Sequence, residues 1–135
     1  MKTLSDLIIE FYEKLSSWEH SVVEGSGLTL PQTHTIEILG VNDGMRMKDL
    51  AAKMGVTTGT LTVMIDNLEK KKLVERTPNP DDRRSYVIKL SPEGVEHYQR
   101  HSNFHIELTR ECVSGFSDEE IQTFRSLLQE FIRHI

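Results

Sequence analysis

Several kinds of sequence feature are scarce or missing in this chain, and each absence excludes a class of protein. The 135 residues contain a single cysteine, Cys112, so no intramolecular disulfide framework can form. No apolar run approaches the roughly 20 residues that a membrane-spanning helix needs. There is no signal peptide, repeat or low-complexity tract. We therefore expect one soluble cytoplasmic domain with no membrane partner.

Catalytic motifs are also missing. The sequence shows no nucleophile paired with a base, no glycine-rich phosphate loop and no cofactor-binding motif. We therefore expect that the protein is not an enzyme.

Positive charge is scarce overall but concentrated in the middle of the chain. The net charge is −5, yet ten of the 16 Lys and Arg residues lie between Arg46 and Lys89, with only six of the 21 Asp and Glu residues. An acidic protein with a basic central region can orient that region toward DNA.

The central region begins with the pattern of two helices joined at a glycine. We expect a first helix over residues 46–54, a turn at Gly55, and a second helix from Thr57 or Thr58 to about residue 72. The Thr57 hydroxyl can accept a free backbone N–H as an N-cap. Apolar residues recur at i, i+3, i+4 and i+7 in the second helix, which predicts one buried face: Leu61, Met64, Ile65 and Leu68.

A polar turn between two short extended segments follows the second helix. The turn covers residues 78–84, and residues 86–90 return as a partner strand. A hairpin directly after two such helices predicts a winged helix-turn-helix, in which one helix enters the DNA major groove and the hairpin tip lies beside it. The predicted fold class is mainly α with a small β-wing.

The second helix and the hairpin supply the candidate DNA-binding residues. Small polar and methyl-bearing side chains on its exposed face can contact base edges: Thr58, Thr60, Thr62, Val63 and Asn67. Basic side chains after them are candidates for phosphate contacts: Lys70, Lys71, Lys72 and Arg76. The alternative for these is a solvated helix end, where lysines interact favourably with the helix dipole.

Amphipathic helices are expected on both sides of this lobe. An apolar stripe covers residues 4–22, a long helix should begin with Pro92 in its first turn, and Ser117 resembles the start of a capping box for the last helix. We assign residues 1–28 and 92–135 to a helical dimerisation frame and residues 29–91 to the winged helix-turn-helix lobe.

The hairpin resembles the wing of MarR-family transcriptional regulators. Asp82-x-Arg84 followed by Leu90-Ser91 is similar to the D-x-R…L-T signature of that family, and residues 73–76 are similar to the segment before it. The resemblance implies a homodimer, built from the first, fifth and sixth helices, that binds a pseudo-palindromic double-stranded DNA operator. It also implies that Arg84 enters the minor groove, and that Asp82 orients the wing arginines, Arg83 and Arg84, by an ion pair.

Histidines occupy apolar positions in the long helix that should follow Ser91. The stripe that includes Tyr98, Leu108 and Cys112 places His101 and His105 where the periodicity favours apolar residues. Histidines at i and i+4 project from one helix face and can share one metal ion. The alternative is that they only pack or titrate.

These histidines give the chain a second resemblance, to the zinc-responsive MarR repressors. That resemblance implies a metal site made of Glu24, His34, His101 and His105, with His20 or Glu19 as alternatives to Glu24. Three neutral imidazoles and a carboxylate form a closed tetrahedral set suited to zinc, which would be regulatory and not catalytic. Nickel, copper and cobalt are alternatives to zinc at this site because nitrogen ligands discriminate weakly between these metals.

Two regulatory hypotheses follow from the sequence. In the first, a metal ion, most simply zinc, controls the binding of a repressor to its operator. In the second, a small phenolic or lipophilic ligand releases the repressor, and Trp18, His34 and His101 line its pocket. We expect Cys112 to pack on an apolar stripe and not to act as a redox sensor.

Overall fold

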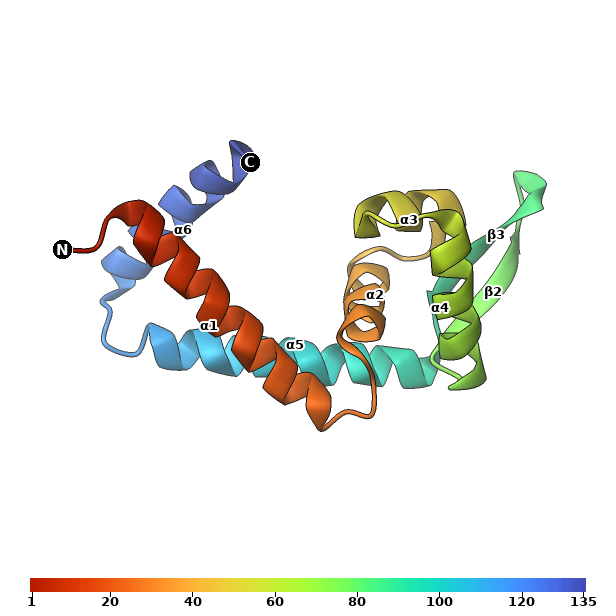
Figure 1. Ribbon diagram of the computed structural model, residues 1–135, viewed down its shortest axis with the longest axis horizontal. Coiled ribbons are helices and arrows are strands. Elements are labelled where there is room, and N and C mark those ends of the chain that lie inside the picture. Colours follow the sequence, from red (N-terminus) through yellow and green to blue (C-terminus); the bar gives the residue numbers. More distant parts are fainter. The chain divides into compact units, whose positions relative to one another are not determined.

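The computed structural model describes residues 1–135. Six helices and three strands follow one another along the chain (Figure 1): α1 (Leu4–Glu24), α2 (Leu30–Val41), β1 (Met45–Arg46), α3 (Met47–Met54), α4 (Thr58–Lys70), β2 (Val74–Asn79), β3 (Asp82–Leu90), α5 (Pro92–Cys112) and α6 (Asp118–Arg133). The chain divides into two units, Met1–His101 and Ser102–Ile135, and the division falls inside the continuous helix α5. None of the helices combines the length and the apolar character required to cross a membrane.

Side-chain caps fix where the helices begin. Thr29 and Ser117 form reciprocal capping boxes with Gln32 and Glu120, and Thr57 accepts a hydrogen bond from the backbone N–H of Thr60. Each cap satisfies a backbone N–H that has no partner within its helix. The predictions that Thr57 caps the second helix of the motif and that Ser117 opens the last helix are confirmed.

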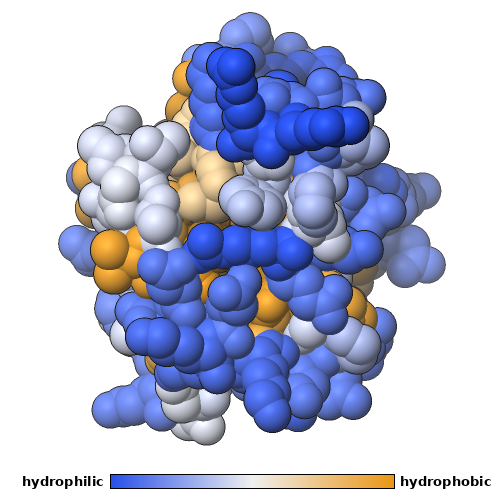
Figure 2. Space-filling model, turned by 90° about the vertical axis from the view of Figure 1, so that its right-hand side faces the viewer, coloured by the Kyte–Doolittle hydropathy of each residue, from blue (hydrophilic) through white to orange (hydrophobic).

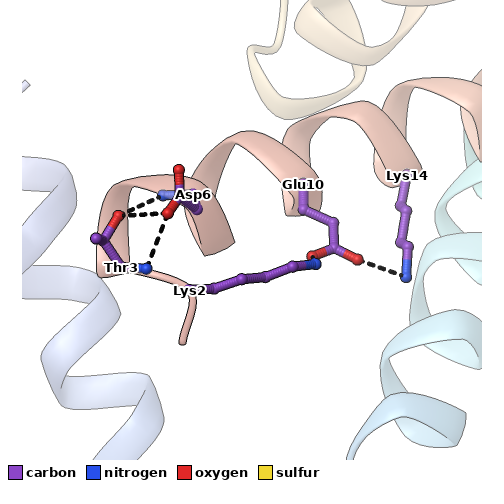
Figure 3. Close-up of polar contacts among 5 residues, drawn as sticks. All are labelled: Lys2, Thr3, Asp6, Glu10 and Lys14. Carbon is purple, nitrogen blue, oxygen red and sulfur yellow. Dashed lines mark hydrogen bonds and ion pairs between the residues drawn. The ribbon is translucent and has the colours of Figure 1, made fainter.

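The start of α1 is fixed by the same chemistry (Figure 3). The Thr3 backbone N–H donates to Asp6 Oδ2 at 2.9 Å, and the Thr3 hydroxyl accepts from the Asp6 backbone N–H at 3.2 Å. The backbone hydrogen bond from Thr3, followed by the one from its hydroxyl, lowers the pKa of Asp6. Hydrogen bonds from Lys2 and Lys14 lower the pKa of Glu10 one turn further along.

A single hydrophobic core lies inside Met1–His101. It is built from α2, α3, α4 and the base of the hairpin, and it contains Ile36, Leu39, Leu50, Ala51, Leu61, Ile65, Leu68, Leu73, Val74 and Ile88. Of the predicted apolar face of α4, Leu61, Ile65 and Leu68 are fully buried and Met64 is half-buried. The 3.6-residue periodicity therefore identified the buried face of this helix correctly.

The sheet is antiparallel with strand order β1-β3-β2. β2 and β3 pair in regular register from Val74↔Leu90 to Pro78↔Tyr86; after a register shift, one further pair, Asn79↔Asp82, leaves Pro80 and Asp81 at the tip. The turn expected over residues 78–84 therefore overlaps the irregular end of the hairpin, although it also included Pro78, which still pairs with Tyr86. β1, which the sequence did not predict, pairs two residues with β3 before α3 begins.

Two glycines allow α5 to approach the lobe closely. A Cβ on Gly40 would lie 2.2 Å from the Tyr98 ring, and a Cβ on Gly94 would lie 2.0 Å from the Leu73 carbonyl oxygen. A side chain at Gly94 would require the backbone to move, and one at Gly40 would displace the Tyr98 ring. The contact of Tyr98 with Gly40 packs α5 against α2 one turn away from His101 and Glu37.

The second unit, Ser102–Ile135, has no buried core of its own. α6 contains no buried residue although its apolar residues share one face, and Phe124, Leu127 and Ile132 are each more than half exposed. Cys112 is exposed as well, so the prediction that its side chain packs is wrong within a single chain. Its stripe continues into Ser102–Ile135, which contains no buried residue.

The predicted fold class is confirmed. The structure is mainly helical, with a small antiparallel wing that follows a helix-turn-helix. α3 ends at Gly55, whose φ of +67° is the left-handed conformation that glycine adopts without strain.

Candidate functional site

One exposed face of α4 presents every base-contact candidate predicted from the sequence. Figure 2 views the side on which α4 and the hairpin lie and shows a largely hydrophilic surface with hydrophobic residues between the hydrophilic ones. Val63 is 63% exposed and offers a methyl surface. The candidates that share this exposed face are Thr58, Thr60, Thr62, Val63 and Asn67. Hydroxyl, amide and methyl groups in this arrangement can contact base edges in a major groove.

The tip of the hairpin presents two arginines to solvent. Arg83 and Arg84 are exposed. The Asn79 side chain, which is buried, accepts from the Asp81 backbone N–H at 3.0 Å and donates to the Ser85 hydroxyl at 3.1 Å. Sequence reasoning missed this role of Asn79, although asparagine before a tight turn is a recognisable signal.

Asp82 organises the tip differently from the way the resemblance implied. Its Oδ1 accepts a hydrogen bond from the Arg84 backbone N–H at 2.9 Å. The carboxylate therefore orders the backbone that carries the arginines, and the structure contains no ion pair between Asp82 and either side chain. A carboxylate two residues before an N–H forms this local bond readily.

Two of the predicted phosphate contacts have partners within the protein. Lys71 donates from Nζ to the Gly27 carbonyl oxygen at 3.0 Å. Arg76, on β2, forms ion pairs with Asp66 and Glu69 of α4. Lys70 and Lys72 are exposed, and Lys72 has a left-handed φ of 62° directly after α4.

A second group of functional side chains lies where α1, α2 and α5 meet. His101 Nε2 is 3.1 Å from Glu19 Oε2 and 2.8 Å from Glu37 Oε1. His101 is only 7% exposed. The three ligand atoms lie within 4.8 Å of one another. His105 follows on the same continuous helix, and the i, i+4 spacing places it on the same helix face as His101.

The chemistry of this group fits a divalent cation. An imidazole Nε2 carries at most one hydrogen, yet two carboxylate oxygens approach it. Four ligands about 2.0 Å from a tetrahedral zinc ion lie about 3.3 Å from each other, close to the separations seen here. Two carboxylates and two neutral imidazoles would balance the charge of one divalent ion, which lowers the cost of burying it.

The structure brings together only part of the metal site expected from the sequence. His101 is in the group, and Glu19, one of the alternatives to Glu24, is the carboxylate from α1. Glu24 lies at the exposed end of α1, and His20 and His34 are exposed. Glu37, one turn beyond His34 on α2, contacts His101 instead. Sequence reasoning missed Glu37 because the resemblance directed attention to histidine at the start of this helix.

A buried hydroxyl lies one helical turn before Glu37 on α2. Thr33 is 5% exposed and its Oγ1 has no hydrogen-bond partner. Thr33 and Glu37 are four residues apart and therefore project from the same face of α2. A hydroxyl in this position can orient a ligand by hydrogen bonding to it.

Comparison with known proteins identifies the class to which this chain belongs. The MarR family model matches residues 28–86, which cover most of the winged helix-turn-helix. The HTH-type transcriptional regulator YsmB of Bacillus subtilis is 35% identical over 103 residues, which span 76% of this chain and 70% of that protein. The chain belongs to the MarR family and is a DNA-binding transcriptional regulator, not an enzyme.

Two further proteins show how far the similarity extends. The homoprotocatechuate degradative operon repressor of Escherichia coli is 28% identical over 130 residues, which span 96% of this chain and 88% of that protein. The structure of S. aureus MepR in complex with DNA superimposes with a TM-score of 0.77 at 25% identity and covers 100% of both chains. The similarity therefore includes the flanking helices as well as the winged helix-turn-helix.

Proposed function

We propose that this protein is a homodimeric repressor whose binding to a pseudo-palindromic operator is controlled by a metal ion held by Glu19, Glu37, His101 and His105. The observation that supports metal control most strongly is the convergence of two carboxylates on the buried Nε2 of His101. Zinc is the simplest ion for this donor set, and nickel, copper and cobalt are the alternatives for the test.

The arrangement of the three helices suggests how the ion would act on DNA binding. Glu37 belongs to α2, which packs inside the core of the DNA-binding lobe. Two residues earlier, the fully buried Thr35 hydroxyl lies 3.0 Å from the sulfur of Met64 on α4. An ion that ties Glu37 to α1 and α5 would restrict α2, and α2 would restrict the position of α4.

The expected sign of the effect is corepression. We call α4, the helix expected to enter the major groove, the recognition helix. A dimer binds best when its two recognition helices match successive turns of the major groove, roughly 34 Å apart. An ion that fixes the lobe should favour this spacing. Metal should then strengthen operator binding, and operator should strengthen metal binding by the same factor.

A titration with three arms tests this proposal. A DNA duplex that binds the parent protein is first selected from a pool of random sequences. The affinity of the protein for this duplex is then measured in Zn²⁺, in a chelator, and in nickel, copper or cobalt. His105→Ala and Glu37→Gln should remove the metal response while circular dichroism shows a folded protein. Equal affinity in zinc and in chelator, with no zinc bound in calorimetry, would contradict metal control.

A small organic ligand is the second candidate effector. The tilted rings of Trp18 and His101, with centroids 6.5 Å apart, place an aromatic surface at the same junction of helices. A relative named for homoprotocatechuate degradation is consistent with an aromatic effector in this family. Release of the duplex by a phenolic acid in the presence of chelator would favour this candidate over the metal.

A further inference from the structure

Arg76 projects from the hairpin toward the recognition helix and not toward solvent. Along β2, Val74 is buried, Glu75 is exposed and Arg76 is half-buried. Successive side chains of a strand alternate between its faces, so Arg76 shares the core-facing side with Val74. Its guanidinium is therefore directed toward α4, and only 27% of its side chain is exposed.

Two carboxylates of α4 receive this guanidinium. One terminal nitrogen of Arg76 forms a hydrogen-bonded ion pair with Asp66 Oδ1, and Nε lies 3.4 Å from Glu69 Oε2. Asp66 and Glu69 are three residues apart on one face of α4, next to the buried residues Ile65 and Leu68. The arginine thus links the edge of the core to the strand that leads to the wing tip.

The link acts at the place where the hairpin leaves the core. Beyond Val74, the next four residues of β2 are exposed or only half-buried. Arg83 and Arg84 lie beyond them at the tip. The angle of the hairpin relative to α4 decides whether the tip can reach a groove while α4 occupies the neighbouring one.

We propose that Arg76 is a positioning residue, which holds the wing at a fixed angle to the recognition helix and does not contact a phosphate. The guanidinium charge is neutralised by the carboxylates of Asp66 and Glu69, so it contributes little attraction to DNA. Its contribution to affinity comes from holding the helix and the tip in the relative position that DNA requires, before DNA arrives.

The sign of the Asp66→Asn effect tests this proposal directly. Removing a negative charge from the DNA-binding face should tighten binding if electrostatics alone decides. The positioning role predicts weaker binding instead, by about threefold, the size expected for one partly exposed ion pair. In an Arg76→Met background the link is already absent, so Asp66→Asn should then tighten binding. This reversal of sign in the double-mutant cycle distinguishes coupling from independent effects.

The salt dependence of binding separates positioning from phosphate contact. Arg76→Met should weaken binding of the selected duplex by about tenfold because the tip loses its fixed angle. The slope of log affinity against log salt should stay at the parent value, whereas loss of a phosphate contact reduces it by about one unit. Arg76→Lys should recover part of the affinity. Lys70→Met, which removes an exposed lysine at the end of α4, is the matched control for the slope.

Three outcomes would overturn the positioning role. The first is tighter or unchanged DNA binding by Asp66→Asn in the parent background. The second is a slope of log affinity against log salt that falls by about one unit in Arg76→Met. The third is an unchanged affinity of Arg76→Met for the selected duplex. The Asp66 side chain is 48% exposed, so its variant should fold even if Arg76→Met proves unstable. Circular dichroism and thermal unfolding establish the folded state of each variant before binding is measured.

Discussion

The two units of this chain differ in how they satisfy similar sequence patterns. α4 and α6 are both amphipathic, with apolar residues at helical spacing. The apolar face of α4 is buried inside Met1–His101, whereas α6, in Ser102–Ile135, buries no residue. Periodicity therefore predicts that a face will be covered, but it does not tell whether the cover comes from the same chain.

Within Met1–His101, α1 is largely uncovered as well. Only Val23 near its end is buried, while Leu4, Leu7 and Phe11 are at least half exposed. A monomer would expose a large apolar surface on these helices, which soluble proteins avoid. The proposed homodimer supplies the missing cover, and the winged helix-turn-helix lobe needs none because its core is complete.

The largest expected effect tests the core of the lobe. Leu61→Ala removes a fully buried side chain from α4 and should lower the free energy of unfolding by about 2–5 kcal/mol. Urea denaturation followed by circular dichroism measures this loss. The matched control is Val63→Ala on the exposed face of the same helix, which should change stability by no more than about 0.5 kcal/mol. Equal losses in the two variants would contradict the assigned burial.

The second prediction tests the uncovered helices. Leu127→Asp places a charge on the exposed apolar face of α6 and should dissociate the proposed dimer while the lobe stays folded. Operator affinity should fall on the order of a hundredfold, because the two half-sites are no longer bound by one linked molecule. Light scattering gives the mass, and gel shift gives the affinity. Gln122→Asp on the polar face is the control, and a dimer that survives Leu127→Asp would sink the idea that α6 is an interface.

Individual residues in both units show which parts of the fold could be predicted from the sequence. Helix ends followed local chemistry, such as the caps at Thr57 and Ser117 and the stop at Gly55, so they were predicted correctly. β1 was missed because two residues carry no periodic pattern. The burial of Cys112 was predicted wrongly because its stripe continues beyond the core of its own chain.

The candidate site shows a different limit of prediction. His101 could be identified because a histidine in an apolar stripe is unusual. Glu37 could not, because its position depends on how α2 crosses α5 where Tyr98 packs on Gly40. A sequence pattern fixes the face of one helix, whereas a ligand set depends on the register between helices. The DNA-contact residues and the metal ligands proposed from the sequence stay predictions until binding is measured.

The third prediction tests the proposed metal ligands inside Met1–His101, which are Glu19, Glu37 and His101. If Glu37 is a ligand, Glu37→Gln should lower zinc affinity by more than the roughly ten- to a hundredfold that the loss of an outer-shell partner costs, since a neutral amide binds the ion weakly. His34→Gln should leave zinc affinity unchanged, because His34 is exposed and lies outside the group. Calorimetry on the full-length protein measures both. The reverse result would favour the ligand set implied by the resemblance over the set seen in the structure.

The smallest expected effect concerns the exposed start of α1. Thr3→Ala removes the cap that the Thr3 hydroxyl provides for Asp6, so the melting temperature should fall slightly at neutral pH. Thr3→Ser keeps the hydroxyl and should behave like the parent. Because the folded pKa of Asp6 is lowered below its ordinary value of 3.8, the stabilisation from its carboxylate is complete above that value.

This stabilisation should be lost as the pH falls through the lowered pKa of Asp6. The difference between the parent and Thr3→Ala should therefore be largest above pH 3.8 and should shrink below it. Thermal unfolding followed by circular dichroism across this range gives the comparison. If α1 is covered by a partner subunit, the same variant should also shift the dimer dissociation constant slightly, because a frayed first turn presents Leu4 and Leu7 less regularly to that partner. A difference that grows toward acid pH would show that another group, and not the Asp6 carboxylate, controls the first turn of α1.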